Sequence, residues 1–347
     1  MKIAYILTAL RDLSSIHVAL DLVSCMMEHG HECKVFYFKD VIELKFPCPT
    51  EKISLFKSIP FSEYDVVHAH CFRPDLYLFL HKPLFNTKTL FINTIHSYLY
   101  PDFRNSMGYL KGSIIATLQL LFMRRIDKNV CMSKAAVKYY SKFLSGHKLT
   151  YSYNTKVIDY HATLSNDEED IITNFKSNFD YVCGSICIVS DIKGLDQVIE
   201  ALTYLPKCGY VIIGNGPAVE KLQELAKTKK VEKQVLFLGF RKDGYRFIPQ
   251  LDVFCMPSHS EGCPVAMLEA AAYGKPIVTT DIPIFKELLT SSESVQFQEN
   301  DIKACAQAIE TAIECGPYLA KNAKAKFDSQ FSFDSFYNRY LSIYKRE

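Results

Sequence analysis

The sequence has few of the features that mark a membrane-spanning, secreted or zinc-stabilised protein. Its longest apolar run, residues 113–123, is shorter than the roughly 20 apolar residues that cross a bilayer as a helix. The opening residues contain one short apolar run before Arg11, which predicts a buried first strand and not a secretory signal. The twelve cysteines form no Cys-x-x-Cys frame, so we expect reduced thiols, as in a cytoplasm, and no zinc module.

Two motifs of phosphate-binding enzymes are also missing. No Asp-x-Asp pair occurs, so we expect no divalent metal clamped on a diphosphate by two carboxylates. The first strand-to-helix turn, LTALRDLSS at residues 7–15, contains no glycine. The stretch IIGNGP at residues 212–217 resembles a phosphate loop, but Val219 occupies the place of the third glycine in a dinucleotide fingerprint. A nicotinamide-dependent dehydrogenase is therefore disfavoured.

The net charge of +2 is unevenly distributed along the chain. Residues 1–160 hold 20 lysines and arginines against 13 acidic residues, and residues 161–347 hold 20 against 25. This difference is either chance scatter on solvated faces or a sign that the first half meets an anionic membrane or acceptor. The apolar run at 113–123 lies between Lys111 and the pair Arg124 and Arg125, which fits an interfacial helix or a helix packed in the core.

The order of elements predicts an α/β fold. With 347 residues the chain is long for one core, and two domains of ordinary size are expected. Short strands rich in β-branched and aromatic residues alternate with amphipathic helices, which indicates parallel sheets covered on both faces. The strands are expected at residues 2–7, 32–38, 64–70, 89–96, 128–133 and 149–154, and then at 185–190, 209–214, 235–240, 252–257, 276–281 and 294–297.

The acidic stretch 165–170 is the best candidate for a linker between the two domains. We therefore expect two doubly wound, Rossmann-like domains at 1–160 and 161–332, with a C-terminal helix at 333–347 packing back onto the first. Ligands of such sheets bind at the carboxyl ends of the strands, so the site residues are expected in a cleft between the domains.

The stretch PSHSEGCPVAMLEAAAYGKP at residues 257–276 predicts a buried carboxylate. Glu269 is the only charged residue between Gly262 and Gly274, on a helix that is apolar on every face. A buried carboxylate needs hydrogen-bond partners, which are either structural groups or a ligand. The start of this helix, near Val265, offers free N–H groups to an anion. A ribose diol on Glu269 with its diphosphate at the helix start would satisfy both features.

Other polar residues are expected at strand ends. Lys193 follows a strand and precedes a helix, where it either neutralises a diphosphate or is solvated. His96 ends one strand and His68 and His70 end its neighbour, in structural or catalytic roles. His68, His70 and Cys71 have the chemistry of metal ligands, but no fourth ligand is evident, so no metal site is expected.

An ordered series of segments resembles the retaining nucleotide-sugar glycosyltransferases of family 4, which have the GT-B fold. The family's mark is two glutamates separated by seven residues, here Glu261 and Glu269. The segments that match, in the expected order, are DVVHAH, TIHSY, CMSKAAVKYY, DIKGLDQVIEAL, YVIIGNGPAVEKLQELA, VLFLGF and MPSHSEGCPVAMLEAAAYGKPIVTTD.

The resemblance implies roles by position. Glu261 would act at the reacting face of the donor sugar with help from His96, Lys193 would contact the diphosphate, and Glu269 would bind the ribose hydroxyls. Backbone near Phe240 would hold the base. The resemblance implies no metal or other cofactor. The remaining implied donor-binding residues are Gly262, Cys263, Pro264, Val265, Gly214, Gly216 and Arg241, and Ser14 and Ser15 lie in the first-turn loop.

Two positions depart from the family pattern. Members usually carry an arginine five residues before the lysine of the Lys-Gly step, and here that position is Ile188. The first turn is usually rich in glycine, and here it is DLSS at residues 12–15. Arg241 or another basic group would then supply the missing charge.

The expected protein is thus a cytoplasmic glycosyltransferase, peripheral at the inner face of the plasma membrane. It would move a sugar, with retention, from a nucleoside diphosphate sugar to a hydroxyl of a glycan or lipid-linked acceptor in bacterial surface polysaccharide or lipopolysaccharide assembly. A UDP-sugar is favoured over a GDP-sugar, and no nucleic-acid partner is expected. The alternatives are a non-hydrolysing sugar-nucleotide epimerase and a non-catalytic nucleotide-sugar binding protein.

Overall fold

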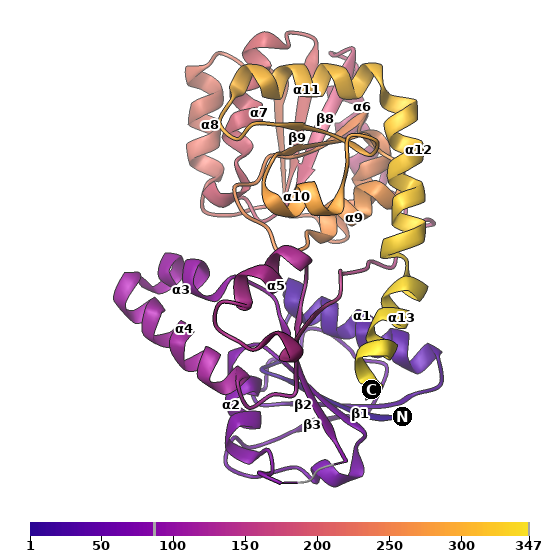
Figure 1. Ribbon diagram of the computed structural model, residues 1–347. Helices are drawn as coiled ribbons and strands as arrows, with labels where there is room; N and C mark the ends of the chain where they lie inside the picture. The colour runs from indigo at the N-terminus through magenta and orange to yellow at the C-terminus, as the bar shows by residue number, and fades with distance from the viewer. Residues whose placement is uncertain (86–87, 346–347) are drawn as a thin grey trace. The chain divides into compact units, whose positions relative to one another are not determined.

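The computed structural model describes residues 1–85 and 88–345 and divides the chain into two compact units (Figure 1). Unit 1 contains Met1–Thr155 and the segment from Ser332 onward, and unit 2 contains Lys156–Phe331. The expected linker at 165–170 is wrong, because these residues begin helix α6 (Asn166–Lys176). Ser165 accepts from the backbone N–H of Glu168 and the Glu168 side chain accepts from that of Ser165, which forms a capping box. The acidic residues therefore stabilise a helix start instead of solvating a linker.

Unit 1 is built on a seven-stranded parallel sheet whose strand order reverses between β1 and β4. The order is β3 (Thr50–Lys52), β2 (Glu32–Tyr37), β1 (Lys2–Leu7), β4 (Val66–His70), β5 (Leu90–Ile95), β6 (Lys128–Cys131) and β7 (Leu149–Tyr151). The helices are α1 (Ser14–Glu28), α2 (Phe72–His81), α3 (Leu99–Met107), α4 (Tyr109–Met123), α5 (Lys134–Tyr140) and α13 (Phe333–Tyr344). The short exposed strand β3 escapes the sequence prediction because none of its three residues is apolar.

Unit 2 is built on a six-stranded parallel sheet with the same reversal, here between β8 and β11. The order is β10 (Val235–Gly239), β9 (Cys208–Ile213), β8 (Tyr181–Ile186), β11 (Val253–Met256), β12 (Ile277–Thr280) and β13 (Ser294–Phe297). The longer helices are α6, α7 (Leu195–Ala201), α8 (Val219–Thr228), α9 (Val265–Ala272), α10 (Pro283–Leu288), α11 (Ile302–Glu314) and α12 (Gly316–Lys326). The two doubly wound, Rossmann-like units that the sequence predicts are confirmed.

One strand lies elsewhere than expected. The first strand of unit 2 is Tyr181–Ile186 and not residues 185–190. Gly184 makes this strand hard to recognise in the sequence. In the fold a Cβ at this position would lie 2.6 Å from the Leu251 side chain, so a larger residue would require Leu251 to shift. After β8 the backbone follows the end of β9 and its loop, because Cys187 donates to the carbonyl of Ile213, the last residue of β9, and Val189 donates to that of Asn215.

The core of unit 1 is completed by helix α13, which packs against α1 (Figure 1). Its buried residues Phe336, Tyr340 and Tyr344 belong to the same cluster as Ile3 and Tyr5 of β1. The three aromatic side chains follow a helical spacing of four, so they form one apolar face. In the described part of the chain, no helix is both long and apolar enough to span a bilayer.

Candidate functional site

The reversal point of the unit 2 sheet brings Lys193 and Glu261 together. Lys193 follows β8 and Glu261 follows β11, and Nζ of Lys193 donates to Oε1 of Glu261 at 2.7 Å. The hydroxyl of Ser258 donates to the same oxygen at 2.8 Å. Both ionic side chains are largely but not fully buried. Open parallel sheets bind ligands at such reversal points, so this pair is a candidate binding group.

The loops that carry this pair are fixed to each other. Gly194 has φ +60°, and a Cβ there would lie 2.2 Å from the carbonyl oxygen of Pro257, so the site requires glycine. Gln197 donates to the same Pro257 oxygen at 2.8 Å, and His259 donates its backbone N–H to the carbonyl of Ile192 at 2.9 Å. Lys193 and Glu261 are therefore positioned by backbone contacts before any ligand arrives.

Gly214 and Gly216 lie in the loop after β9 and allow it to pack against residues 187–189. A Cβ at Gly214 would lie 1.8 Å from the carbonyl oxygen of Cys187, and one at Gly216 would lie 2.2 Å from that of Val189. Both glycines thus have a packing function. Donor binding by these two glycines, which the family resemblance implies, stays a prediction.

Glu269 lies in α9 with only 7% of its surface exposed. Its Oε1 is 3.8 Å from Nζ of Lys156, which is itself positioned over the ring of Tyr245 at 5.7 Å. The helix begins at Val265, directly after the buried Cys263 and Pro264, and no side chain caps it. The predicted burial of this helix is confirmed. The carboxylate sits next to a cation and a half-buried aromatic ring, on the helix that follows Gly262.

Ile188 stands where family members usually carry an arginine, so the charge of that arginine would have to come from another residue of unit 2. Ile188 is 71% exposed and offers no charge. Phe240 follows β10 and is 69% exposed. Arg241 lies 3.9 Å from Glu168, the capping residue of α6, which also binds Arg246 at 3.0 Å. Nε of Arg241 is buried and has no hydrogen-bond partner in the described part of the chain. Its guanidinium is therefore only loosely paired with the protein.

Three histidines form a buried row in unit 1. Nδ1 of His70 lies 3.0 Å from Nε2 of His96, and the rings of His68 and His70 stack with centroids 4.6 Å apart. Burial lowers the pKa of His96 to about 4 and that of His68 to about 3, and it lowers the pKa of His70 well below the usual range. All three rings are therefore neutral near pH 7, so one of the paired nitrogens of His70 and His96 carries the proton and the other accepts it.

The histidine row does not offer a metal site. His68 uses both ring nitrogens, Nδ1 with the hydroxyl of Tyr344 at 2.7 Å and Nε2 with that of Thr94 at 2.8 Å. Burial also raises the pKa of the Cys71 thiol to about 11, so the thiolate that binds metals is not formed near neutral pH. Among residues 1–85 and 88–345, no three His, Cys, Asp or Glu side chains are arranged to hold a metal ion.

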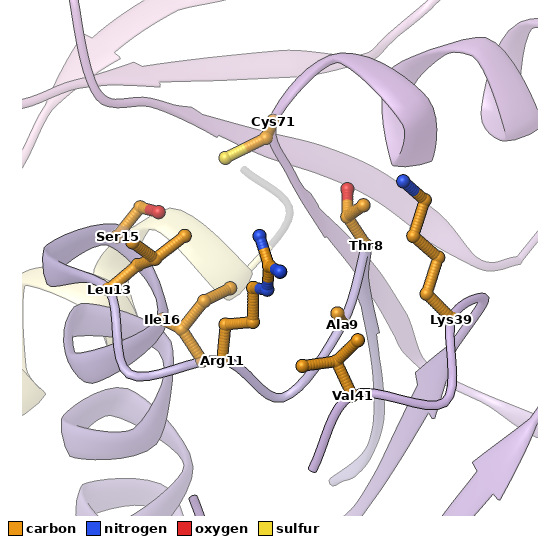
Figure 2. Close-up of a pocket in the computed structure, with 9 residues that line it drawn as sticks. All are labelled: Thr8, Ala9, Arg11, Leu13, Ser15, Ile16, Lys39, Val41 and Cys71. Atoms are coloured by element: carbon orange, nitrogen blue, oxygen red, sulfur yellow. The ribbon is translucent and has the colours of Figure 1, made fainter. Parts of the chain in front are cut away.

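Ser14 and Ser15 are the first two residues of α1. Ser15 lines a cavity of about 340 Å³ together with Arg11, Lys39 and Cys71 (Figure 2). Arg11 and Lys39 are not among the residues that the sequence singled out, and neither is Lys156 beside Glu269. Lysines and arginines are common on surfaces, and no sequence pattern marks those that line a cavity or approach a residue more than a hundred positions away.

Comparison with known proteins agrees with this architecture. Residues 173–328 match the model of the family "Glycosyl transferases group 1". The chain is 30% identical over 354 residues to the O-antigen biosynthesis glycosyltransferase WclY of Escherichia coli, and the match covers 99% of this chain and 98% of that protein. The crystal structure of Anabaena HepE in complex with UDP and glucose superposes with a TM-score of 0.80 at 17% identity, covering 99% of both chains.

A second solved structure and a more distant relative extend this likeness. WaaG, a glycosyltransferase involved in lipopolysaccharide biosynthesis, superposes with a TM-score of 0.70 at 15% identity over 99% of this chain and all of that one. An α-1,3-galactosyltransferase of Escherichia coli, named for UDP-Gal and a GlcNAc-diphosphoundecaprenol acceptor, is 25% identical over 245 residues, 66% of this chain and 61% of that one. The two Rossmann-like units thus have the GT-B fold, and the chain belongs to the group 1 glycosyltransferases.

Proposed function

We propose that the protein transfers a sugar from a nucleoside diphosphate sugar, preferably a UDP-sugar, to an acceptor hydroxyl with retention at the anomeric carbon. The observation that carries this proposal is the Lys193–Glu261 pair at the reversal point of unit 2, in the same unit as the buried Glu269. The likeness to HepE, which was crystallised with UDP and glucose, supports the choice of UDP. The spacing of the two glutamates supports assignment to the retaining family 4.

The donor would be bound by charge complementarity in unit 2. Lys193 would leave Glu261 in part to contact the diphosphate, and the uncapped start of α9 would offer its N–H groups to the same anion. Glu269 would accept hydrogen bonds from the ribose hydroxyls, because a carboxylate is a strong acceptor. Because Lys193 and the helix dipole supply the positive charge, we expect no metal ion in the reaction.

Glu261 and His96 would act on the donor sugar. The carboxylate of Glu261 would stabilise the positive charge that develops at the anomeric carbon. His96 is neutral near pH 7 and pairs through Nε2, so Nδ1 would be the atom that contacts the sugar. His70 would hold that ring in place.

The acceptor would be a glycan or lipid-linked saccharide of a bacterial surface polysaccharide. Support comes from the relatives, one named for O-antigen biosynthesis and one for a diphosphoundecaprenol acceptor. A lipid-linked acceptor requires access to a membrane surface. Helix α4 has apolar side chains that are exposed on one face, Leu110, Ile114, Leu118 and Leu121, at spacings of three and four residues.

The charges around α4 fit an anionic membrane. Lys111 and Arg124 at its two ends are exposed, whereas Arg125 donates to the carbonyls of Phe79 and Lys82 and therefore belongs to the packed helix end. We therefore propose that the protein is peripheral at the cytoplasmic face of the plasma membrane, with α4 lying in the interface.

Donor binding tests the proposal directly. Calorimetric titration of UDP into Glu269→Gln should show a loss of about 1.5–3 kcal/mol, or roughly 10- to 150-fold in Kd. Lys193→Gln should weaken binding similarly. The matched controls are Glu224→Gln and Lys227→Gln in α8, which remove charges of the same kind outside the site, from two exposed residues that pair with each other at 3.5 Å. Unchanged UDP affinity in folded Glu269→Gln and Lys193→Gln proteins would refute the donor site.

A second function, non-catalytic binding of a nucleotide sugar, is favoured by the exposed Ile188 in place of an arginine. Turnover separates it from the enzyme. A glycosyltransferase releases free UDP from a UDP-sugar in step with added acceptor, a binding protein releases none, and an epimerase interconverts the sugar with no acceptor present.

A further inference from the structure

The cavity in unit 1 lies where ligands bind in doubly wound sheets. Its walls lie at the carboxyl ends of three neighbouring strands (Figure 2). The loop after β1 contributes Arg11, the first turn of α1 contributes Ser15, the loop after β2 contributes Lys39, and the residue after β4 is Cys71. The sheet order reverses between β1 and β4, so the cavity occupies the reversal point itself. The donor residues Lys193, Glu261 and Glu269 all belong to the other unit.

The polar groups of this cavity are cationic or neutral. Figure 2 shows the guanidinium of Arg11 reaching into the middle of the cavity, with the ammonium of Lys39 beyond the hydroxyl of Thr8 and the hydroxyl of Ser15 on the opposite wall. The remaining lining side chains are Ala9, Leu13, Ile16, Val41 and Cys71, and none of the lining residues is acidic.

The two cations are not neutralised by the protein. Neither Arg11 nor Lys39 has an ion pair or a side-chain hydrogen bond within residues 1–85 and 88–345. The acidic residues beside them in the sequence are engaged elsewhere, Asp12 with His17 at 2.6 Å and Asp40 with Lys52. Two like charges around one cavity repel each other unless an anion is bound between them.

The loops that carry the cations are fixed before any ligand binds. The carbonyl of Thr8 accepts the backbone N–H groups of Phe38 and Lys39 at 3.3 and 3.1 Å, and Leu10 donates to the carbonyl of Val41 at 3.0 Å. Glu43 donates its backbone N–H back to Leu10 at 2.8 Å. The backbone at Arg11 and Lys39 therefore loses little freedom when an anion binds, which favours affinity.

We propose that this cavity binds a phosphate or diphosphate group carried by the acceptor. Two cations that line one cavity match a ligand with two or more negative charges, and the hydroxyls of Thr8 and Ser15 complement its oxygens. The uncapped first turn of α1 adds its dipole to the same region. The identity of the ligand as an acceptor rests on the proposed function, but binding of a phosphate in this cavity does not.

The test uses inorganic pyrophosphate as the probe and the full-length protein. Because pyrophosphate also resembles the donor diphosphate, it is titrated with the donor site saturated by UDP. Arg11→Gln and Lys39→Gln should each weaken pyrophosphate binding by about tenfold or more, with UDP affinity unchanged. Lys45→Gln, an exposed lysine of the same connection that does not line the cavity, is the control and should bind as the wild type does.

Hydrogen exchange locates the bound probe independently of affinity. Pyrophosphate should slow exchange in peptides that span residues 8–16 and 38–42. Three outcomes would overturn the proposal: no second pyrophosphate site beside bound UDP, equal weakening by Lys45→Gln, or a loss of UDP affinity in Arg11→Gln that places the cavity in the donor site. If the protein binds pyrophosphate in this cavity but transfers no sugar, the proposed function is refuted and the phosphate site still stands.

Discussion

Replacement of Asp75 by asparagine should stabilise unit 1 in a way that depends on pH. Asp75 of α2 is buried, and its carboxylate oxygens accept from Nδ2 of Asn93 at 3.2 Å and from Nε2 of Gln119 at 2.8 Å. Burial raises its pKa from 3.8 to about 7, although the two amide donors lower it. No cation forms an ion pair with it in the part of the chain that the structure describes. The group is therefore more costly to ionise in the folded protein than in the unfolded chain.

The size of the effect follows from the two pKa values. The folded protein holds the proton more tightly, so the free energy of unfolding falls as pH rises from about 4 to about 7, by about 1.4 kcal/mol per pH unit, and is level above that. A shift of about three units corresponds to a full cost of about 4 kcal/mol. Asp75→Asn removes this cost. The new amide can be satisfied, because Oδ1 of Asn93 and Oε1 of Gln119 have no partners among the described residues and can turn to accept from it.

Hydrogen exchange followed by mass spectrometry measures this difference in unit 1 alone. Peptides from β4 and β5, which have the same sequence in the wild type and in Asp75→Asn, are compared at the same pH, so the intrinsic exchange rates cancel. The advantage of the variant should grow by about 2–3 kcal/mol between pH 5 and pH 8. Glu63→Gln, which neutralises an exposed carboxylate of the same unit, should show no such trend. A difference between wild type and Asp75→Asn that stays constant over this range would refute the reasoning.

Two further predictions concern the charge balance of the donor site and the exposed face of α4. Glycosyl transfer should survive EDTA, because Lys193 and the start of α9 supply the positive charge; loss of activity that magnesium or manganese restores would show that a metal ion takes part. Sedimentation with anionic vesicles should fall steeply as salt is added, and Ile114→Ser with Leu118→Ser should weaken it while UDP affinity stays constant. Binding that is indifferent to salt, or equal on neutral vesicles, would exclude the electrostatic part of this contact.

The sequence predicts the alternation of strands and helices well because continuous apolar strands have few other interpretations. It places β8 wrongly because Gly184 lowers the apparent strand propensity of residues 181–186 below that of the apolar loop that follows them. It mistakes the start of α6 for a linker because acidic residues are typical of both solvated linkers and first helical turns. It predicts the buried carboxylate Glu269 because a lone charge in an apolar helix is conspicuous.

The contacts between distant segments are beyond such reasoning. The approach of Lys156 to Glu269 spans more than a hundred positions, and the contact of His70 with His96 depends on the register of β4 and β5. The cavity of Arg11 and Lys39 exists because backbone hydrogen bonds join two loops that follow different strands. Sequence patterns specify elements and their buried faces, whereas such contacts are set by the angles and registers at which the elements pack.

Helix α13 has a consequence for how the protein is made. Its residues Phe336, Tyr340 and Tyr344 pack in the same core cluster as residues of β1, and the hydroxyl of Tyr344 forms a hydrogen bond with the buried His68. A ribosome that has completed Thr155 must add 189 more residues to reach Tyr344. At bacterial rates of about 5–20 residues per second this takes roughly 10–40 s. During that interval the nascent first unit exposes an aromatic-binding face, and the second unit is complete before the first is closed.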